Sequence, residues 1–150
     1  MTAGRTVARA ALVAAGVVAL DQLTKAIVRS EIEYPFEKHD LVLGLKLVHT
    51  HNTGVAFSMF SGGGAVVVLI ALVALAALLG FFFTHLKTRL VWLPTGMLLG
   101  GAVGNLIDRI RLGWVTDFIK IPHWPAFNVA DIAVTLGVIV LIFVLEKASK

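Results

Sequence analysis

Two aspartates, Asp117 and Asp131, stand among aromatic, proline and aliphatic residues in the stretch GWVTDFIKIPHWPAFNVAD, residues 113–131. Two carboxyl groups that lie close together in a poorly solvated site cannot easily both ionise, so they hold one proton between them. The ionised member can then take a proton from water, while the protonated member donates to the carbonyl oxygen under attack. The two aspartates therefore suggest general acid–base hydrolysis without a covalent intermediate.

Asp131 also has a structural interpretation. Asn128 resembles a helix N-cap, and Asp131 follows three residues later, where a carboxylate can accept backbone N–H bonds. Asp117 has no such alternative, because it stands between Thr116 and Phe118 in an apolar stretch.

Long apolar runs flank these aspartates. The chain has 150 residues and is 58% hydrophobic, which is too apolar for an ordinary soluble domain. The run from 65 to 83 has no charged residue and can cross the roughly 30 Å hydrocarbon layer as a helix. We predict one domain, 1–150, that is an α-helical membrane protein with four spans. The expected spans cover about residues 7–28, 65–84, 91–109 and 129–145.

Four spans place both termini on the same side of the membrane. Basic residues are dense at the termini and in the short loop after the second span, which predicts that these parts are cytoplasmic. These residues are Arg5, Arg9, Lys87, Arg89, Lys147 and Lys150. The net charge of +4 fits such flanks better than it fits nucleic-acid binding.

The composition narrows the chemistry further. The chain has no cysteine, which excludes disulfides, cysteine nucleophiles and cysteine-ligated metals. The first apolar run begins like a signal peptide but continues into DQLTK rather than a small-residue cleavage site, so we expect an uncleaved span.

The segment 30–64 after the first span is expected to lie outside the cytoplasm. In LVLGLKLVHTH, Leu41, Leu43, Leu45 and Leu47 alternate with other residues, which is typical of a strand with one apolar face. We therefore predict a small extracytoplasmic β-sheet between spans one and two, followed by a flexible SGGG joint.

Five polar clusters lie in or beside the spans. Alternation of the spans places all five at the membrane face away from the termini, and ionisable residues at such depths usually mark function. The clusters are DQLTK (21–25), HNTGVAFS (51–58), GNLIDR (104–109), VTDF (115–118) and FNVAD (127–131).

Some of these clusters have structural interpretations. Asp21 and Lys25 are four residues apart and can neutralise each other on one helix face. Asn105, Asp108 and Arg109 sit on adjacent helical turns, where a network that ties helices together is at least as good an interpretation as catalysis.

Small residues in the third span suggest close helix packing. Gly96, Gly100 and Gly104 are spaced four residues apart on one helix face, which in a membrane is typical of a seam where another helix approaches closely.

Other chemistries are less well supported. His49 and His51 could share a strand face with His123 as a third metal ligand, but no HExxH helix indicates a zinc protease. Ser58 with Lys25 could form a serine–lysine hydrolase, but nothing local positions the two. A small transporter or channel would place carboxylates nearer the bilayer centre, with polar features facing both sides.

At the five clusters the sequence resembles the lipoprotein signal peptidases, the type II bacterial signal peptidases. DQLTK, NTGVAF, GGAVGNLIDR, VTDF and FNVAD occur in order, at the family's spacing, over nearly the whole chain. The resemblance implies an aspartyl endopeptidase that needs no metal or cofactor, with Asp117 and Asp131 as the catalytic pair. It also implies a monomer in the bacterial cytoplasmic (inner) membrane, with the site near the outer face and with membrane lipids, not nucleic acid, as surroundings.

The implied substrate is a prolipoprotein whose future N-terminal cysteine carries diacylglycerol, cut just before that cysteine. The resemblance assigns Asp21, Lys25 and Asp108 to the structural frame. Residues implied to bind substrate or support the site are Asn52, Gly54, Ala56, Asn105, Arg109, Asn128 and Ala130. An apolar lining for a lipid-facing groove is expected from Phe57, Phe118, Trp124 and Phe127.

Overall fold

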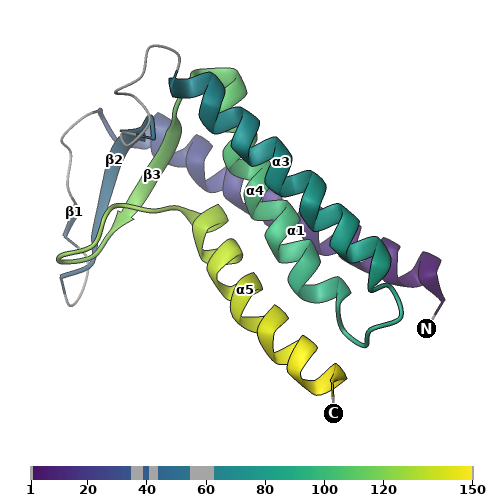
Figure 1. Ribbon diagram of the computed structural model, residues 1–150. Coiled ribbons are helices and arrows are strands. Elements are labelled where there is room, and N and C mark those ends of the chain that lie inside the picture. The colour runs from purple at the N-terminus through teal and green to yellow at the C-terminus, as the bar shows by residue number, and fades with distance from the viewer. Residues whose placement is uncertain (1, 35–38, 41–43, 55–62, 150) are drawn as a thin grey trace.

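The computed structural model describes residues 2–34, 39–40, 44–54 and 63–149. Four helices and three strands occur in this part of the chain. In order they are α1 (Ala3–Glu31), β1 (His39–Asp40), β2 (Lys46–Asn52), α3 (Gly63–Thr84), α4 (Trp92–Leu112), β3 (Val115–Lys120) and α5 (Val129–Ala148). Figure 1 shows the sheet at one end of the helices, while both termini and the α3–α4 connection lie toward the other end.

The helices match the four apolar stretches of the sequence, but they differ in composition. Among the described residues, three helical segments are long and apolar enough to cross a membrane: Ala3–Glu31, Ala65–Thr84 and Val129–Ala148. The remaining helix, α4, contains several glycines and the polar Asn105, Asp108 and Arg109. It packs against each of the other three helices, so much of its surface faces protein rather than lipid.

The glycine seam of α4 is confirmed. A Cβ atom on Gly96 would lie 2.6 Å from the Cβ of Val13, and one on Gly100 would lie 2.7 Å from the Cβ of Val17. Both distances are shorter than real Cβ contacts, so α1 can approach α4 this closely only because hydrogen replaces a side chain. The seam thereby fixes how α1 is placed against α4.

The sheet is larger than the sequence pattern predicted. Its strand order is β1-β2-β3, with antiparallel pairing throughout, so β3 joins it from beyond α4 rather than from the segment between α1 and α3. Thr50 pairs with Asp117 and Asn52 pairs with Val115. The prediction of a sheet confined to residues 30–64 was therefore incomplete, and β3 carries one of the two aspartates.

The expected leucine alternation lies largely outside the described strands. Leu41 and Leu43 fall outside the described residues, and β2 begins at Lys46. Within β2 the neighbouring Val48 and His49 are both buried, and the pairing register shifts between Leu47 and Thr50. An irregular strand of this kind breaks the period-two pattern.

Two sets of contacts hold the sheet against neighbouring segments, one at the end of α1 and one in the connections that follow α1 and α4. Phe118 of β3 packs with Val28 and Ile32 in a buried apolar cluster. On β2, the His51 ring stacks between Tyr34 and Trp114, with ring centroids 3.7 Å and 4.3 Å away. Burial, with a contribution from His49, lowers the pKa of His51, so this ring stays uncharged within its stack at neutral pH.

Candidate active site

Asp117 is buried in the middle of β3, with only 2% of its surface exposed. Its Oδ2 atom accepts a 2.9 Å hydrogen bond from Nδ2 of Asn52, and its Oδ1 atom accepts a 2.7 Å bond from Nδ2 of Asn128. Burial raises the pKa of Asp117 to about 6; the charge of Asp131 acts in the same direction, while the amide donors oppose it. This carboxyl can therefore hold a proton at a pH where an ordinary aspartate is ionised.

Asp131 lies in the first turn of α5. Its Oδ2 atom accepts from the backbone N–H of Asn128 at 3.2 Å, and its own backbone N–H donates to Oδ1 of Asn128 at 3.0 Å. This reciprocal capping box confirms the predicted N-cap. Its Oδ1 atom accepts a 2.8 Å bond from Nδ2 of Asn105, so the carboxylate is held from both α4 and α5.

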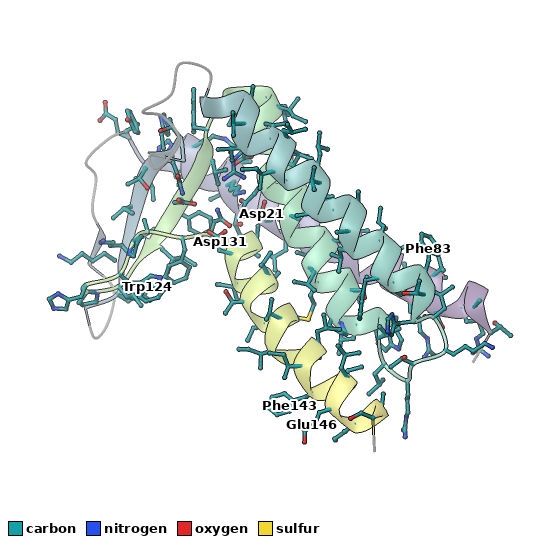
Figure 2. All side chains as sticks on the ribbon, viewed as in Figure 1. Asp21, Phe83, Trp124, Asp131, Phe143 and Glu146 are labelled. Carbon is teal, nitrogen blue, oxygen red and sulfur yellow. The ribbon has the colours of Figure 1, made fainter. Side chains whose placement is uncertain are left out.

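Asn128 connects the two aspartates. Its side chain donates to Asp117, and its backbone N–H donates to Asp131. One residue therefore fixes one carboxylate of β3 and one of α5 relative to each other. Figure 2 shows Asp131 at the start of α5, at the end of the helices that is near the sheet, with Asp21 nearby.

Lys25 determines the orientation of the Asn105 amide. Oδ1 of Asn105 accepts from Nζ of Lys25 at 2.9 Å and from Nδ2 of Asn128 at 3.1 Å. Because two donors occupy the amide oxygen, the amide nitrogen faces Asp131. If the Asn105 amide were reversed, its NH₂ group would face the donors of Lys25 and Asn128, and Asp131 would lose this hydrogen bond.

Behind the aspartates lies a buried charged network. The ammonium group of Lys25, fully buried, lies 2.9 Å from Oδ2 of Asp21 and 3.3 Å from Oδ2 of Asp108. The predicted contact between Asp21 and Lys25 is therefore confirmed. Asp108 also accepts the backbone N–H of Thr116 at 3.0 Å, which ties α4 to the residue that precedes Asp117.

Asp21 has a second contact that bears on α5. Its Oδ1 atom accepts the backbone N–H of Ala130 at 3.0 Å, and Ala130 is completely buried. A Cβ on Gly104 would lie 2.6 Å from Oδ2 of Asp21, so Gly104 leaves the room that this carboxylate needs. Asp21 thereby anchors the first turn of α5, one residue before Asp131.

Two residues of this network were not singled out from the sequence. The side-chain amide of Gln22 donates to Asp21, to Asp108 and to the carbonyl of Gly104 at 3.1–3.2 Å. Arg29 donates to Oγ1 of Thr116 at 3.1 Å and lies 3.8 Å from Asp108. Arg29 stands four residues after Lys25 on the same helix face, and this spacing could have indicated it.

The NTG segment orients Asn52. The backbone N–H of Gly54 donates to Oδ1 of Asn52 at 2.9 Å, so the amide nitrogen points to Asp117. Gly54 has φ +74°, a conformation that favours glycine. Ala56 lies outside the described residues, as do Phe57 and Ser58.

Residues expected at the site line two separate cavities. Arg109 and Thr53 line a cavity of about 330 Å³ against α3. Asp131 opens onto a groove of about 270 Å³ whose wall includes Trp124 and Phe127. Phe118, also expected in such a groove, lies instead in the buried cluster on α1.

The histidines have other contacts. Nδ1 of His49 lies 2.8 Å from the carbonyl oxygen of Ile32, and His51 is in the aromatic stack. Across the described ranges, no group of three His, Cys, Asp or Glu side chains is placed to hold a metal ion. Lys25, the lysine considered with Ser58, is occupied by Asp21, Asp108 and Asn105.

Similar proteins have been described in several bacteria. A family model for signal peptidase II matches residues 13–146. The lipoprotein signal peptidase of Dehalococcoides mccartyi is 41% identical over 91% of this chain and 87% of its own. That of Halothermothrix orenii is 34% identical over 89% of this chain and 92% of its own.

Solved structures agree with this match. One bacterial membrane enzyme superposes with a TM-score of 0.84 at 32% identity, covering 91% of each chain. Another superposes with a TM-score of 0.82 at 31% identity, covering 94% of this chain and 89% of that one. With a family model that covers most of the sequence and relatives of this identity, the chain belongs to the signal peptidase II family, the lipoprotein signal peptidases.

Proposed function

We propose that the protein is a membrane-embedded aspartyl endopeptidase that removes signal peptides from prolipoproteins. Family membership supports the peptidase activity and the substrate class. The observation that carries the catalytic assignment is the arrangement around Asn128, which donates to Asp117 and Asp131 at once. Two carboxyls held in this way, one of them deeply buried, suit the sharing of a single proton.

Asp117 is the protonated member of the pair and Asp131 the ionised one. Burial favours the neutral form of Asp117. Asp131 lies in the first turn of α5, where the helix dipole favours a negative charge.

The reaction follows from these protonation states. Asp131 takes a proton from water, the resulting hydroxide attacks the scissile carbonyl carbon, and Asp117 donates its proton to the carbonyl oxygen. In the collapse of the tetrahedral intermediate, Asp131 gives its proton to the leaving amine while Asp117 regains a proton from the hydroxyl group. Both aspartates then return to their starting states, and no acyl-enzyme forms.

The four helices α1, α3, α4 and α5 each span the bacterial inner membrane in this proposal. The glycine-rich α4 is tolerated as a span because its three neighbours enclose it. The chain functions as a monomer with both termini in the cytoplasm, as the basic residues at that end suggest. The aspartates then lie near the outer face, where the peptide bond meets water.

The substrate is cut just before a cysteine that carries diacylglycerol. Two acyl chains that stay in the bilayer fix the depth of this cysteine, since each buried methylene contributes roughly 0.8 kcal/mol of anchoring. The groove that joins Trp124 and Phe127 to Asp131 provides an apolar path from the lipid to the carboxylate. Binding energy from these remote chains would orient the reacting carbonyl.

Purified enzyme and one precursor peptide, with and without the diacylglyceryl group, test the proposal. Asp117→Asn and Asp131→Asn should each lose at least the 10²–10⁴-fold in rate typical of one acid–base group, while remaining folded. The exposed Glu33 provides the control Glu33→Gln, which should cleave normally. Asp108→Asn should mainly lower stability, because Asp108 contacts Lys25 and Thr116 rather than either aspartate.

Near-normal cleavage by Asp117→Asn or Asp131→Asn would refute the catalytic pair. Equal turnover of the lipidated and unlipidated peptides would remove the lipid from substrate recognition.

A further inference from the structure

Another cavity, of about 780 Å³, lies at the opposite end of the molecule from the aspartates (Figure 2). Its walls are the connection between α3 and α4, including Lys87, Arg89 and Leu90, and the last turns of α5, including Phe143 and Lys147. Figure 2 shows Phe143 near the end of α5, whereas Asp131 lies at its start. The cavity is therefore separate from the candidate active site.

The rim of this cavity is positively charged. Lys87, Arg89 and Lys147 line it, and none of its lining residues is acidic. None of these three cations forms an ion pair with a carboxylate in the part of the chain that the structure describes. Three cations around one hollow create a positive potential that favours an anion.

The interior wall of the cavity is apolar. Val140, Phe143 and Val144 come from successive turns of one face of α5. Phe143 is 60% exposed and Leu90, on the opposite wall, is 44% exposed. A volume of this size lies within the range of sites for small ligands. A molecule with an anionic head and apolar chains matches both the rim and the wall.

Leu90 adds an independent observation. Its φ is 66°, in the left-handed region that branched, bulky side chains rarely adopt. Such conformations persist where surrounding structure enforces them, and they cluster at ligand sites. Leu90 also lines a neighbouring cavity of about 490 Å³, together with Arg9 and Trp92, so the same turn faces both hollows.

We propose that the cavity binds an anionic phospholipid of the cytoplasmic leaflet. The phosphate lies among Lys87, Arg89 and Lys147, and the acyl chains run along Val140 and Phe143 into the bilayer. Basic pockets on the cytoplasmic side of membrane helices are suited to such head groups. The choice of leaflet rests on the membrane orientation proposed above, whereas the binding itself does not depend on the peptidase activity.

The bound lipid would hold together the α3–α4 connection and α5, which itself packs on α4. Its head group would join the α3–α4 connection to the end of α5, and its chains would cover the exposed Phe143. Phospholipid binding should therefore stabilise α5, the helix whose first turn carries Asp131.

The test uses the full-length protein in detergent, titrated with phosphatidylglycerol or phosphatidylcholine. Bound lipid is counted by native mass spectrometry, and the melting temperature is recorded. We expect phosphatidylglycerol to bind at least tenfold more tightly than phosphatidylcholine and to raise the melting temperature. The double variant Arg89→Ala/Lys147→Ala should weaken phosphatidylglycerol binding by roughly tenfold or more.

Two further variants test whether the lipid binds in the cavity or is only attracted by positive charge on the protein surface. Arg5→Ala/Arg111→Ala also removes two exposed basic residues but leaves the cavity intact, so its affinity should change less than threefold. Val140→Trp keeps every charge but fills the cavity, and it should also lose the lipid. Equal losses in the two double variants, or full binding by Val140→Trp, would refute the cavity as the site.

The remaining controls distinguish a phospholipid from free phosphate. They also test lipid binding and peptide cleavage separately. Inorganic phosphate and glycerophosphoglycerol at matched concentration should not stabilise the protein; equal stabilisation by either would show a free-phosphate site instead. Asp117→Asn should bind phosphatidylglycerol like the unaltered protein, and Arg89→Ala/Lys147→Ala should still cleave in detergent. Loss of lipid preference with intact cleavage would overturn this inference alone, and the reverse result would overturn the proposed function alone.

Discussion

The side-chain amide of Asn128 donates to the carboxyl group of Asp117 across 2.7 Å. The same side chain accepts the backbone N–H of Asp131 and caps α5. The start of a helix and the alignment of a carboxyl pair thus depend on opposite ends of one amide group.

Replacement of Asn128 by serine should separate these two roles. A serine hydroxyl can still cap α5, but it cannot reach Asp117 as the amide does. We expect Asn128→Ser to keep nearly normal stability and to lose about ten- to a hundredfold in kcat, since the buried Asp117 carboxyl loses the donor that aligns it, and an unsatisfied buried polar group costs about 1–3 kcal/mol. Asn128→Ala should lose similar activity and also about 1 kcal/mol of stability. Cleavage rates and melting curves of both variants provide the comparison, and full activity in Asn128→Ser would exclude the positioning role.

The pH profile should show Asp117 acting as the acid. Because burial raises its pKa to about 6 and the mechanism needs its protonated form, kcat/KM should fall as the pH rises through about 6. The fall in kcat should occur at a higher pH than the fall in kcat/KM, because bound substrate excludes water from the Asp117 carboxyl and further favours its neutral form.

Asn52→Ala should shift this fall in activity to higher pH. The hydrogen bond from Asn52 lowers the pKa of Asp117, so its removal raises that pKa and keeps the acid protonated to higher pH. Thr50→Val is a matched control on the same strand, because Thr50 donates to the backbone carbonyl of Asp117 rather than to its carboxyl. An unchanged midpoint in Asn52→Ala would show that the fall in activity does not report Asp117. Activity that rises rather than falls with pH, with a midpoint that moves upward in Asn52→Ala, would assign Asp117 to the base instead.

Two glycine substitutions should have opposite outcomes. A Cβ at Gly100 would lie 2.8 Å from the backbone oxygen of Ala14, whereas Gly80 has nothing within 4 Å. Gly100→Ala must push α1 away from α4 and should cost about 1–3 kcal/mol. Gly80→Ala should be neutral or slightly stabilising, since alanine favours the helix. Thermal unfolding in one detergent measures both, and equal stability of the two variants would contradict the close packing.

Single cysteines should report the membrane orientation, because the chain has no cysteine of its own. Glu33 and Lys87 are both exposed and lie at opposite ends of the helices. An impermeant thiol reagent added to intact cells should label Glu33→Cys and leave Lys87→Cys unlabelled until the cells are opened. The reverse pattern would invert the proposed topology and place the lipid cavity in the outer leaflet.

Much of this arrangement follows from local sequence patterns. The i, i+4 spacing of Asp21 and Lys25 predicts their contact, the spacing of Gly96 and Gly100 predicts the seam, and Asn128 predicts the start of α5. Each depends on residues within one helix or on the hydrophobicity of a single segment. Such features are readable because helical geometry alone brings the residues to one face.

Strand β3 could not be read in the same way. Its first four residues, from Val115 to Phe118, are all buried, so no alternation of apolar and polar residues distinguishes two faces. Asn52, which donates a hydrogen bond to Asp117, lies 65 residues away from it in the sequence. No local spacing indicates that pairing. The hydrogen-bonding role of Gln22 likewise depends on how α1 and α4 meet, which composition does not specify.

The assembly of both aspartates around α5 has a consequence during synthesis. A nascent chain that ends before residue 128 contains Asp117 but has neither the amide that aligns it nor its carboxylate partner. Under the proposed mechanism, proteolytic competence therefore arises only when the final helix has left the ribosome and entered the bilayer. Truncated translation products would then be inert, and the membrane would never hold a partly made peptidase that can cut.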